Sequence, residues 1–368
     1  MKININIIRL IMISIMISQA LEAKVTYRGG IKLGLQYHDS ASDIALGGNL
    51  HAEGMLGKGL SLGATLESTQ ALLGQHDAQG MAFFSHDAKG YSILSEAYIK
   101  GVFGKTEVTF GRQSLDTPFL DSDDIGMIAN HFEAYTLSNQ DIQDTILFYT
   151  YVRQMSGVDA DIPESFTSLN PHAGLHTLGL MYETDAGVSL SAWYYTLPNR
   201  AQLSYADFAY EGQAEGVQYA FAVQMAWQAF VSQEQAKVFG LTASLSHDKS
   251  ALTCTFSYDS AIDAGAVNGF GGGPYFVNME HLTLQELEDG GDVFVYGLEW
   301  NPVESVSFAS TFASLEDTNA NRGEELDMLV HYAYHDRLSF DAIYSKIDNI
   351  HISGDRFDNV RVFANYRF

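Results

Sequence analysis

The sequence has only one cysteine, Cys254, among its 368 residues. A single cysteine cannot form an internal disulfide, so backbone hydrogen bonds and packing alone must hold the folded chain together. A closed β-barrel provides both, because none of its strands is left with an unpaired edge.

Long apolar runs are absent beyond Ala20. A membrane-spanning helix needs about 20 consecutive apolar residues, so spanning helices are excluded for the rest of the chain. The first 20 residues have Lys2 and Arg9, then an apolar run over residues 10–17, and they end in Ser-Gln-Ala. This is the pattern of a secretory signal peptide, and we predict one over residues 1–20.

Basic residues are scarce. There are 20 Lys and Arg against 45 Asp and Glu, and the formal net charge is −25. A nucleic-acid partner is excluded, because phosphate binding needs a cationic surface. The acidity instead indicates solvated loops or an acidic lumen.

What the sequence does have is alternation of polarity with a period of two, which is typical of β-strands with two unlike faces. From Leu252 onward the residues Leu252, Cys254, Phe256 and Tyr258 share one face, and polar residues share the other. Eighteen segments follow this pattern, with sixteen as the alternative count. They span residues 25–37, 44–56, 59–69, 90–103, 105–113, 131–139, 143–154, 175–184, 187–197, 202–211, 216–228, 236–247, 250–260, 292–300, 303–314, 324–335, 336–349 and 356–367.

The connections alternate between short and long. Those after even-numbered strands are short, and most contain the Gly, Asn, Asp or Pro of tight hairpins. Every long connection follows an odd-numbered strand: 70–89, 114–130, 155–174 and 261–291. Short turns at one rim and long loops at the other are typical of transmembrane barrels. We therefore predict that residues 21–368 form one all-β domain, a transmembrane antiparallel β-barrel with long extracellular loops that fold into the lumen.

A soluble sandwich also alternates, but two features favour the membrane barrel. The strands are about 10 residues long, as tilted membrane strands require, and aromatic residues cluster near strand ends, as in an interfacial girdle. The last strand ends in Tyr366 and Phe368 on one apolar face. Such an ending resembles the signal that barrel-assembly machinery recognises, so this machinery and the lipid of the outer membrane are predicted partners.

Three patches resemble the outer-membrane porin D family, including major outer-membrane porins of campylobacterial type. They are Phe110–Phe119 followed by His131-Phe132-Glu133-Ala134, then Gly272–Glu280, and finally Arg361–Phe368. The resemblance implies that the loops 114–130, 155–174 and 261–291 narrow the lumen. It also implies a homotrimer.

Strand parity assigns the charged residues that face the lumen, where eight acids outnumber five bases. The acids are Glu53, Glu67, Glu96, Glu183, Asp259, Glu299, Asp327 and Asp341, and the bases are Arg28, Lys32, Lys100, Arg361 and Arg367. The loop 114–130 adds Asp116, Asp121, Asp123 and Asp124. A barrel of sixteen or more strands encloses an aqueous lumen, and a negatively lined constriction concentrates cations. We therefore expect passive diffusion of small hydrophilic solutes and ions, with cation preference.

The alternative function is a substrate-selective channel. The family also contains channels for small carboxylates and basic amino acids that use a row of arginines. Arg28, Lys100, Arg153 and Arg361 are the candidates for such a row here. Arg112 is a further selectivity candidate, but it reaches the lumen only if Gly111 interrupts the alternation with a bulge.

Other kinds of site have weaker support. Asp121, Asp123 and Asp124 are candidate calcium ligands, although the EF-hand pattern fails at Ile125 and Phe132; no other cofactor is expected. An outer-membrane hydrolase would need a nucleophile paired with a histidine. A Gly-x-Ser-x-Gly match at residues 59–63 begins a predicted strand, and it does not form the strand-to-helix elbow that exposes such a nucleophile. A surface adhesin is the third class. We expect a channel of the cell outer membrane that is not an enzyme.

Overall fold

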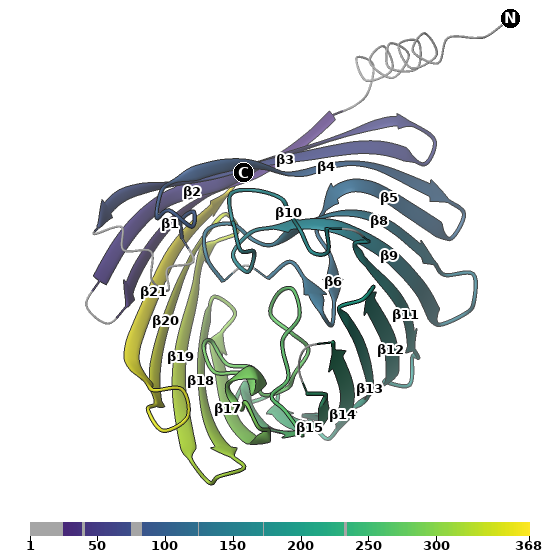
Figure 1. Cartoon of the computed structure of the whole chain (residues 1–368). Helices are drawn as coiled ribbons and strands as arrows, with labels where there is room; N and C mark the ends of the chain where they lie inside the picture. Colours follow the sequence, from purple (N-terminus) through teal and green to yellow (C-terminus); the bar gives the residue numbers. More distant parts are fainter. Residues whose placement is uncertain (1–24, 39–40, 75–82, 124, 172, 232–233) are drawn as a thin grey trace, which may run out of the picture.

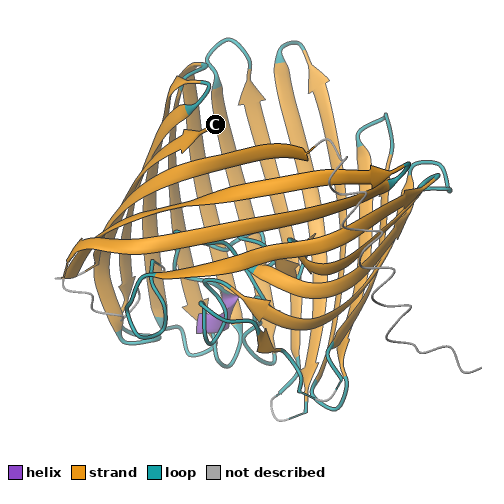
Figure 2. Ribbon diagram, turned by 90° about the horizontal axis from the view of Figure 1, so that it is seen from above, coloured by secondary structure: helices purple, strands orange, loops and turns teal. Residues whose placement is uncertain are grey.

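The chain folds into a ring of strands around a partly filled centre (Figure 1). This computed structural model describes residues 25–38, 41–74, 83–123, 125–171, 173–231 and 234–368. The predicted signal peptide, residues 1–20, lies outside the described residues. Figure 2 shows the strands wrapping around the wall, with a short 3-10 helix, Leu284–Glu286, inside it.

Nineteen strands belong to one sheet. One of them, β10 (Thr167–Ser168), is two residues long and pairs only with β9, so eighteen strands make the wall. Pairing of β1 with β21 closes the ring. The wall strands are β1 Val25–His38, β2 Ala41–Gly57, β3 Leu60–Gly74, β4 Tyr91–Phe103, β5 Thr106–Gln113, β8 His131–Asn139, β9 Thr145–Ser156, β11 Leu175–Glu183, β12 Val188–Leu197, β13 Ala201–Ala214, β14 Val217–Phe230, β15 Ala236–His247, β16 Leu252–Ile262, β17 Gly291–Val303, β18 Val306–Asp317, β19 Arg322–His335, β20 Leu338–Asn349 and β21 Asp355–Arg367.

All eighteen predicted strands are present, and every neighbouring pair is antiparallel. Most boundaries differ from the predicted ones by a few residues. The largest extension is at the end of β3, which continues to Gly74 instead of ending at residue 69. The predicted fold class, a closed antiparallel barrel of eighteen strands, is confirmed.

The outer face of the wall is apolar. Alternate residues of β1, such as Leu33, Leu35 and Tyr37, expose much of their side chains, whereas Gln36 between them is buried. Cys254 is also exposed on this outer face. A continuous exposed apolar surface is what a lipid environment requires. Among the described residues, no helix is long and apolar enough to cross a membrane.

The buried core of the protein lies inside the ring. The loop 114–130 carries the small hairpin β6 (Asp116–Thr117) and β7 (Leu120–Asp121), and its Phe119 is completely buried. The Phe119 ring makes edge contacts with the rings of Tyr195, Tyr205 and Tyr275, at centroid distances of 5.3 to 6.2 Å. Burial of these rings holds the loop against the wall formed by β12 and β13.

The loops 114–130 and 261–291 also join each other through their backbones. The Phe270 N–H donates to the Phe119 carbonyl at 2.9 Å, and the Asp121 N–H donates to the Phe270 carbonyl at 3.1 Å. Gly271 makes this approach possible, because it has a φ of +118° and a Cβ there would lie 2.2 Å from the Asp121 carbonyl oxygen. Figure 1 shows both segments within the ring of strands. The prediction that long loops fold into the lumen is therefore confirmed.

Candidate solute pathway

The loops leave an open cavity of about 890 Å³ along the inner face of β1–β4 and β18–β21. Residues of the inward loops, including Asp123, Ile125 and Glu280, form part of its lining. This volume lies within the range of pockets that hold small organic molecules. We take this cavity as the candidate solute pathway.

Four cationic side chains line the cavity along the junction of the first and last strands. Arg28 and Lys32 belong to β1, and Arg361 and Arg367 belong to β21. The β1–β21 pairing places Arg367 opposite Gly30 and Arg361 opposite Gln36. These cations therefore follow one another along the strands from the rim of short turns toward the inward loops.

Two of these cations hold the loops in place. The Lys32 Nζ donates to the Gly126 carbonyl at 3.1 Å, and the Arg361 guanidinium donates to the Ile125 carbonyl. Arg361 also forms an ion pair with Glu280 of the loop 261–291. Arg361 is almost completely buried, so its charge is largely used to hold the two loops at the inner end of the cavity.

The other two cations are free to meet a solute. Arg28 and Arg367 are exposed. Within the described part of the chain, no carboxylate forms an ion pair with either guanidinium. Each guanidinium keeps its planar set of N–H donors, which matches the geometry of a carboxylate.

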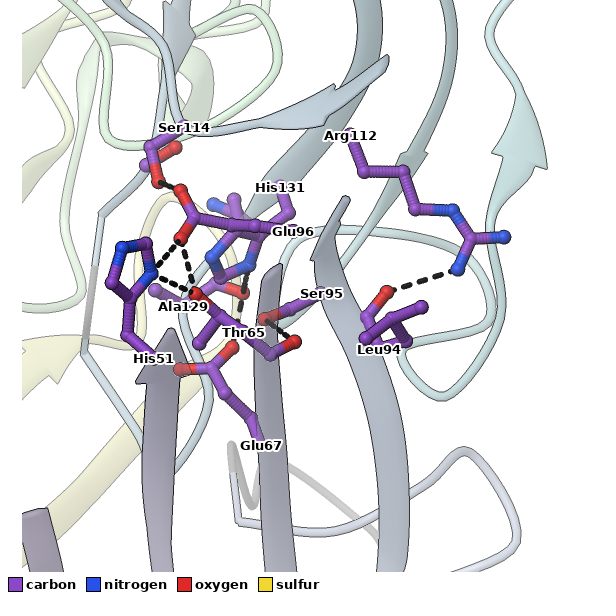
Figure 3. Close-up of polar contacts among 12 residues, drawn as sticks. His51, Thr65, Glu67, Leu94, Ser95, Glu96, Arg112, Ser114, Ala129 and His131 are labelled. Atoms are coloured by element: carbon purple, nitrogen blue, oxygen red, sulfur yellow. Dashed lines mark hydrogen bonds and ion pairs between the residues drawn. The ribbon is translucent and has the colours of Figure 1, made fainter. Parts of the chain in front are cut away.

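A polar row crosses the inner face next to Arg28. In the strand register, Arg28 lies opposite His51, His51 opposite Thr65, and Thr65 opposite Glu96. The His51 Nδ1 lies 2.7 Å from the Thr65 Oγ1, which donates to the Glu96 carboxylate (Figure 3). The Ser114 hydroxyl donates to the other Glu96 oxygen at 3.2 Å. The Glu96 carboxylate therefore has hydrogen-bond donors on both oxygens.

The remaining acids of the cavity also have close partners. The Glu67 carboxylate lies 3.5 Å from the His131 Nδ1, which is 3.1 Å from the Ala129 carbonyl (Figure 3). The Asp341 carboxylate is bonded to the His331 Nδ1 at 2.6 Å and accepts from Asn365 at 2.8 Å. The acids are thus held in local networks, whereas Arg28 and Arg367 are not.

The structure brings five of the predicted selectivity residues to this cavity, and it places six others elsewhere. Those at the cavity are Arg28, Glu67, Glu96, Asp123 and Arg361. Glu53 accepts from Ser61 at 2.9 Å, and Lys100 forms an ion pair with Glu107 at 2.8 Å; neither lines the cavity. Asp116 and Asp121 lie opposite each other in the β6–β7 hairpin. Burial and the carboxylates of Asp116 and Asp123 raise the pKa of Asp121.

Arg112 and Arg153 lie apart from the cavity. Gly111 has a φ of +121°, yet the β5–β8 register continues without a shift, so Arg112 stays on the same face as the exposed Phe110. Figure 3 shows Arg112 pointing away from His51 and Glu96. Arg153 forms an ion pair with Glu133 at 2.7 Å, and half of its side chain is exposed. The predicted row of Arg28, Lys100, Arg153 and Arg361 is therefore not assembled as a row.

No group of three or more His, Cys, Asp or Glu residues in the described part of the chain is arranged to hold a metal ion. Of the candidate calcium ligands, Asp124 lies outside the described residues. Calcium binding by Asp121, Asp123 and Asp124 thus stays a prediction.

Sequence reasoning missed His51, Thr65, His131 and Glu280 as parts of the cavity. Parity did offer a signal for His51, because it lies two residues before Glu53 and so shares its inward face. Glu280 lies in a long loop, where no periodicity fixes the direction of a side chain.

Comparison with known proteins agrees with this architecture. The family described as outer membrane porin, OprD family, matches residues 45–263. No curated protein matches. Among solved structures, OccK9 (OpdG) of Pseudomonas aeruginosa superposes with a TM-score of 0.80 at 15% identity, over 95% of this chain and 99% of that one.

Two further structures cover almost the same extent. OpdK of Pseudomonas aeruginosa with vanillate has a TM-score of 0.81 at 13% identity, over 94% of this chain and 98% of that one. OccAB3 of Acinetobacter baumannii has a TM-score of 0.79 at 14% identity, over 94% and 99%. The resemblance to campylobacterial porins gains no support from these matches. The family match covers more than half of the chain, and the chain therefore belongs to the OprD family of outer-membrane porins.

Proposed function

We propose that this porin is selective for small organic carboxylates. The observation that carries the proposal is the pair of exposed guanidinium groups, Arg28 and Arg367, in a cavity whose acids are already bonded to other groups. A carboxylate entering from the loops would pass Arg361 and Lys32, which hold the loops, and would then meet Arg28 and Arg367. Because both of these exposed cations attract the same anion, transfer from one to the other needs no large barrier.

The structural relatives support the proposed chemistry. One was solved with vanillate, and OccK2 (OpdF) of Pseudomonas aeruginosa was solved in complex with glucuronate. Both ligands carry a carboxylate. The cavity here, about 890 Å³, has room for a molecule of that size.

Solute flux tests the proposal. Proteoliposomes containing the porin should take up benzoate or glucuronate faster than neutral solutes of equal size, such as benzamide or glucose. The double variant Arg28→Gln, Arg367→Gln should lose most of this preference, because it removes both free cations. Lys100→Gln is the matched control, since Lys100 is a cation outside the cavity lining that has its own carboxylate partner. Equal loss in the control would contradict the proposal.

The second candidate is a porin that prefers cations. It is favoured by the formal net charge of −25 and by five carboxylates in the cavity lining: Glu67, Glu96, Asp123, Glu280 and Asp341. Faster flux of small cations than of carboxylates in the same vesicles would support this candidate.

The remaining proposals concern assembly and activity. The apolar face of β21 ends in Tyr366 and Phe368, which supports recognition by barrel-assembly machinery. A homotrimer, removal of residues 1–20 as a signal peptide and a closer kinship to campylobacterial porins are further proposals from the sequence. We also propose that the chain has no enzymatic activity. The family that this chain matches is described as one of porins, which supports this proposal.

A further inference from the structure

The outer face of the barrel carries an unusual group of charges at the extracellular ends of β5, β8 and β9. Arg112, Glu133 and Arg153, here called the outer-rim patch, lie on three neighbouring strands. Arg112 is the register partner of Glu133, and Glu133 forms an ion pair with Arg153 at 2.7 Å. Two guanidinium groups face one carboxylate, so the patch has a net positive charge.

Aromatic rings mark the level of the patch relative to the membrane. Phe110, Tyr135 and Tyr151 form a row on the same three strands, with ring centroids 5.8 and 6.0 Å apart. Phe110 and Tyr135 have 48% and 40% of their surfaces exposed on the outer face. Rows of aromatic residues lie at the boundary between the apolar layer and the headgroups. Each charge of the patch is two residues farther toward the extracellular end than the ring on its strand, which places the patch among headgroups.

Arg112 is held with part of its charge uncompensated. Its guanidinium lies 4.2 Å from the centroid of the Phe166 ring and donates to the Leu94 carbonyl at 2.9 Å. Within the described residues no carboxylate forms an ion pair with it. The Phe166 ring fixes the guanidinium plane, so little conformational entropy is lost when an anion binds.

The opposite wall has rim arginines of a different kind. Arg322 forms an ion pair with Glu316 at 2.8 Å, and Arg356 forms one with Asp348 at 2.9 Å. Each of these arginines has its own carboxylate. The charges of Arg322 and Arg356 are therefore neutralised by their carboxylate partners, whereas Arg112 of the outer-rim patch keeps a positive charge that can attract an additional anion.

We propose that the outer-rim patch binds a phosphate group of a lipid in the outer leaflet. Arginine recognises phosphate through two parallel N–H bonds. The aromatic row just below the patch would contact the acyl chains or sugar of the same lipid. Because the patch lies on the outer face, this inference is independent of the solutes that pass through the lumen.

Native mass spectrometry of the folded, detergent-purified porin tests the proposal. The probe is diphosphorylated lipid A, compared with its fully dephosphorylated form. Arg112→Gln should weaken the affinity for the diphosphorylated lipid about tenfold, the loss expected for a charge-assisted hydrogen bond, and should leave the affinity for the dephosphorylated lipid unchanged. Arg112→Lys, which keeps the charge, should recover part of the loss and shows that folding is not the cause.

Arg356→Gln is the matched control on the opposite wall, and it should not change either affinity. Three results would overturn the proposal. They are equal losses in Arg112→Gln and Arg356→Gln, no preference of the wild-type porin for the phosphorylated lipid, or displacement of the lipid by equimolar inorganic phosphate.

Discussion

Glu325 of β19 binds the backbone of the loop 261–291 through hydrogen bonds. Replacing it by glutamine is the most informative single change for testing what holds this loop in place. The side chain is completely buried, and its two oxygens accept from the N–H groups of His281 and Leu282 at 3.1 and 2.6 Å. The neighbouring Asp327 accepts from the Glu280 N–H at 3.3 Å. Three consecutive backbone donors of the loop are therefore held by two carboxylates.

In Glu325→Gln an amide NH₂ replaces one accepting oxygen, so one buried N–H of the loop faces another donor. An unsatisfied buried donor costs about 1–3 kcal/mol. Taking about 2 kcal/mol, the ratio of detached to docked loop rises roughly 30-fold. Because Glu280 reaches the cavity and pairs with Arg361, detachment of this segment should change the width of the pathway.

Single-channel recording in planar bilayers measures this effect as open-channel current noise and brief conductance steps. Both should become more frequent in Glu325→Gln. Glu324→Gln is the matched control, because Glu324 is the preceding residue and is exposed. If Glu325→Gln records were indistinguishable from wild type, Glu325 would not be what holds this loop in place.

Three further predictions concern the loops and the wall. His281 accepts from the Asn359 amide at 2.9 Å, and burial, reinforced by His38, lowers its pKa to about 4. The docked loop thus favours the neutral imidazole. The free energy that holds the loop in its docked position should fall by up to about 3 kcal/mol as the pH drops from about 6.5 to 4. Open-channel current noise should therefore rise over this pH range in the wild-type porin and stay constant in His281→Gln. Phe119→Ala removes a fully buried ring from the loop 114–130, at a cost of about 3–5 kcal/mol, and amide exchange over residues 114–123 should accelerate while exchange in the β-strands stays unchanged. Gly48→Ala places a Cβ 2.2 Å from the Gly30 carbonyl oxygen at a φ of +156°, and this strain should lower the midpoint of heat denaturation. Gly57→Ala is the control and should leave the midpoint unchanged, because a Cβ at residue 57 would have no atom within 4 Å. Equal midpoints for the two variants would contradict the strain argument.

The wall of the barrel was predictable because it obeys a simple period. Alternation along 252–260 fixed both the strand and the face of Asp259, and short turns such as Gly104, with its φ of +64°, separated one hairpin from the next. Parity also placed Arg28, Glu67, Glu96 and Arg361 correctly on the inner face. A period of two carries this information because successive side chains of a strand point to opposite faces.

The arrangement inside the lumen was less accessible from sequence. The rings of Tyr195 and Tyr205 occupy inward positions that a water-filled lumen would leave polar. They are buried there because Phe119 of a distant loop packs against them. Likewise, Glu280 meets Arg361 only once the two loops have docked. Contacts of this kind depend on tertiary packing between segments far apart in the chain, for which local periodicity has no signal.

The central claim, that this porin selects carboxylates through Arg28 and Arg367, is tested most directly by the reversal potential of a single channel under a gradient of potassium benzoate. The account predicts a potential whose sign shows that benzoate is more permeant than potassium, and a shift toward potassium in Arg28→Gln, Arg367→Gln. A potential that shows potassium to be more permeant in the wild-type channel would contradict the claim and would favour a cation-preferring pore.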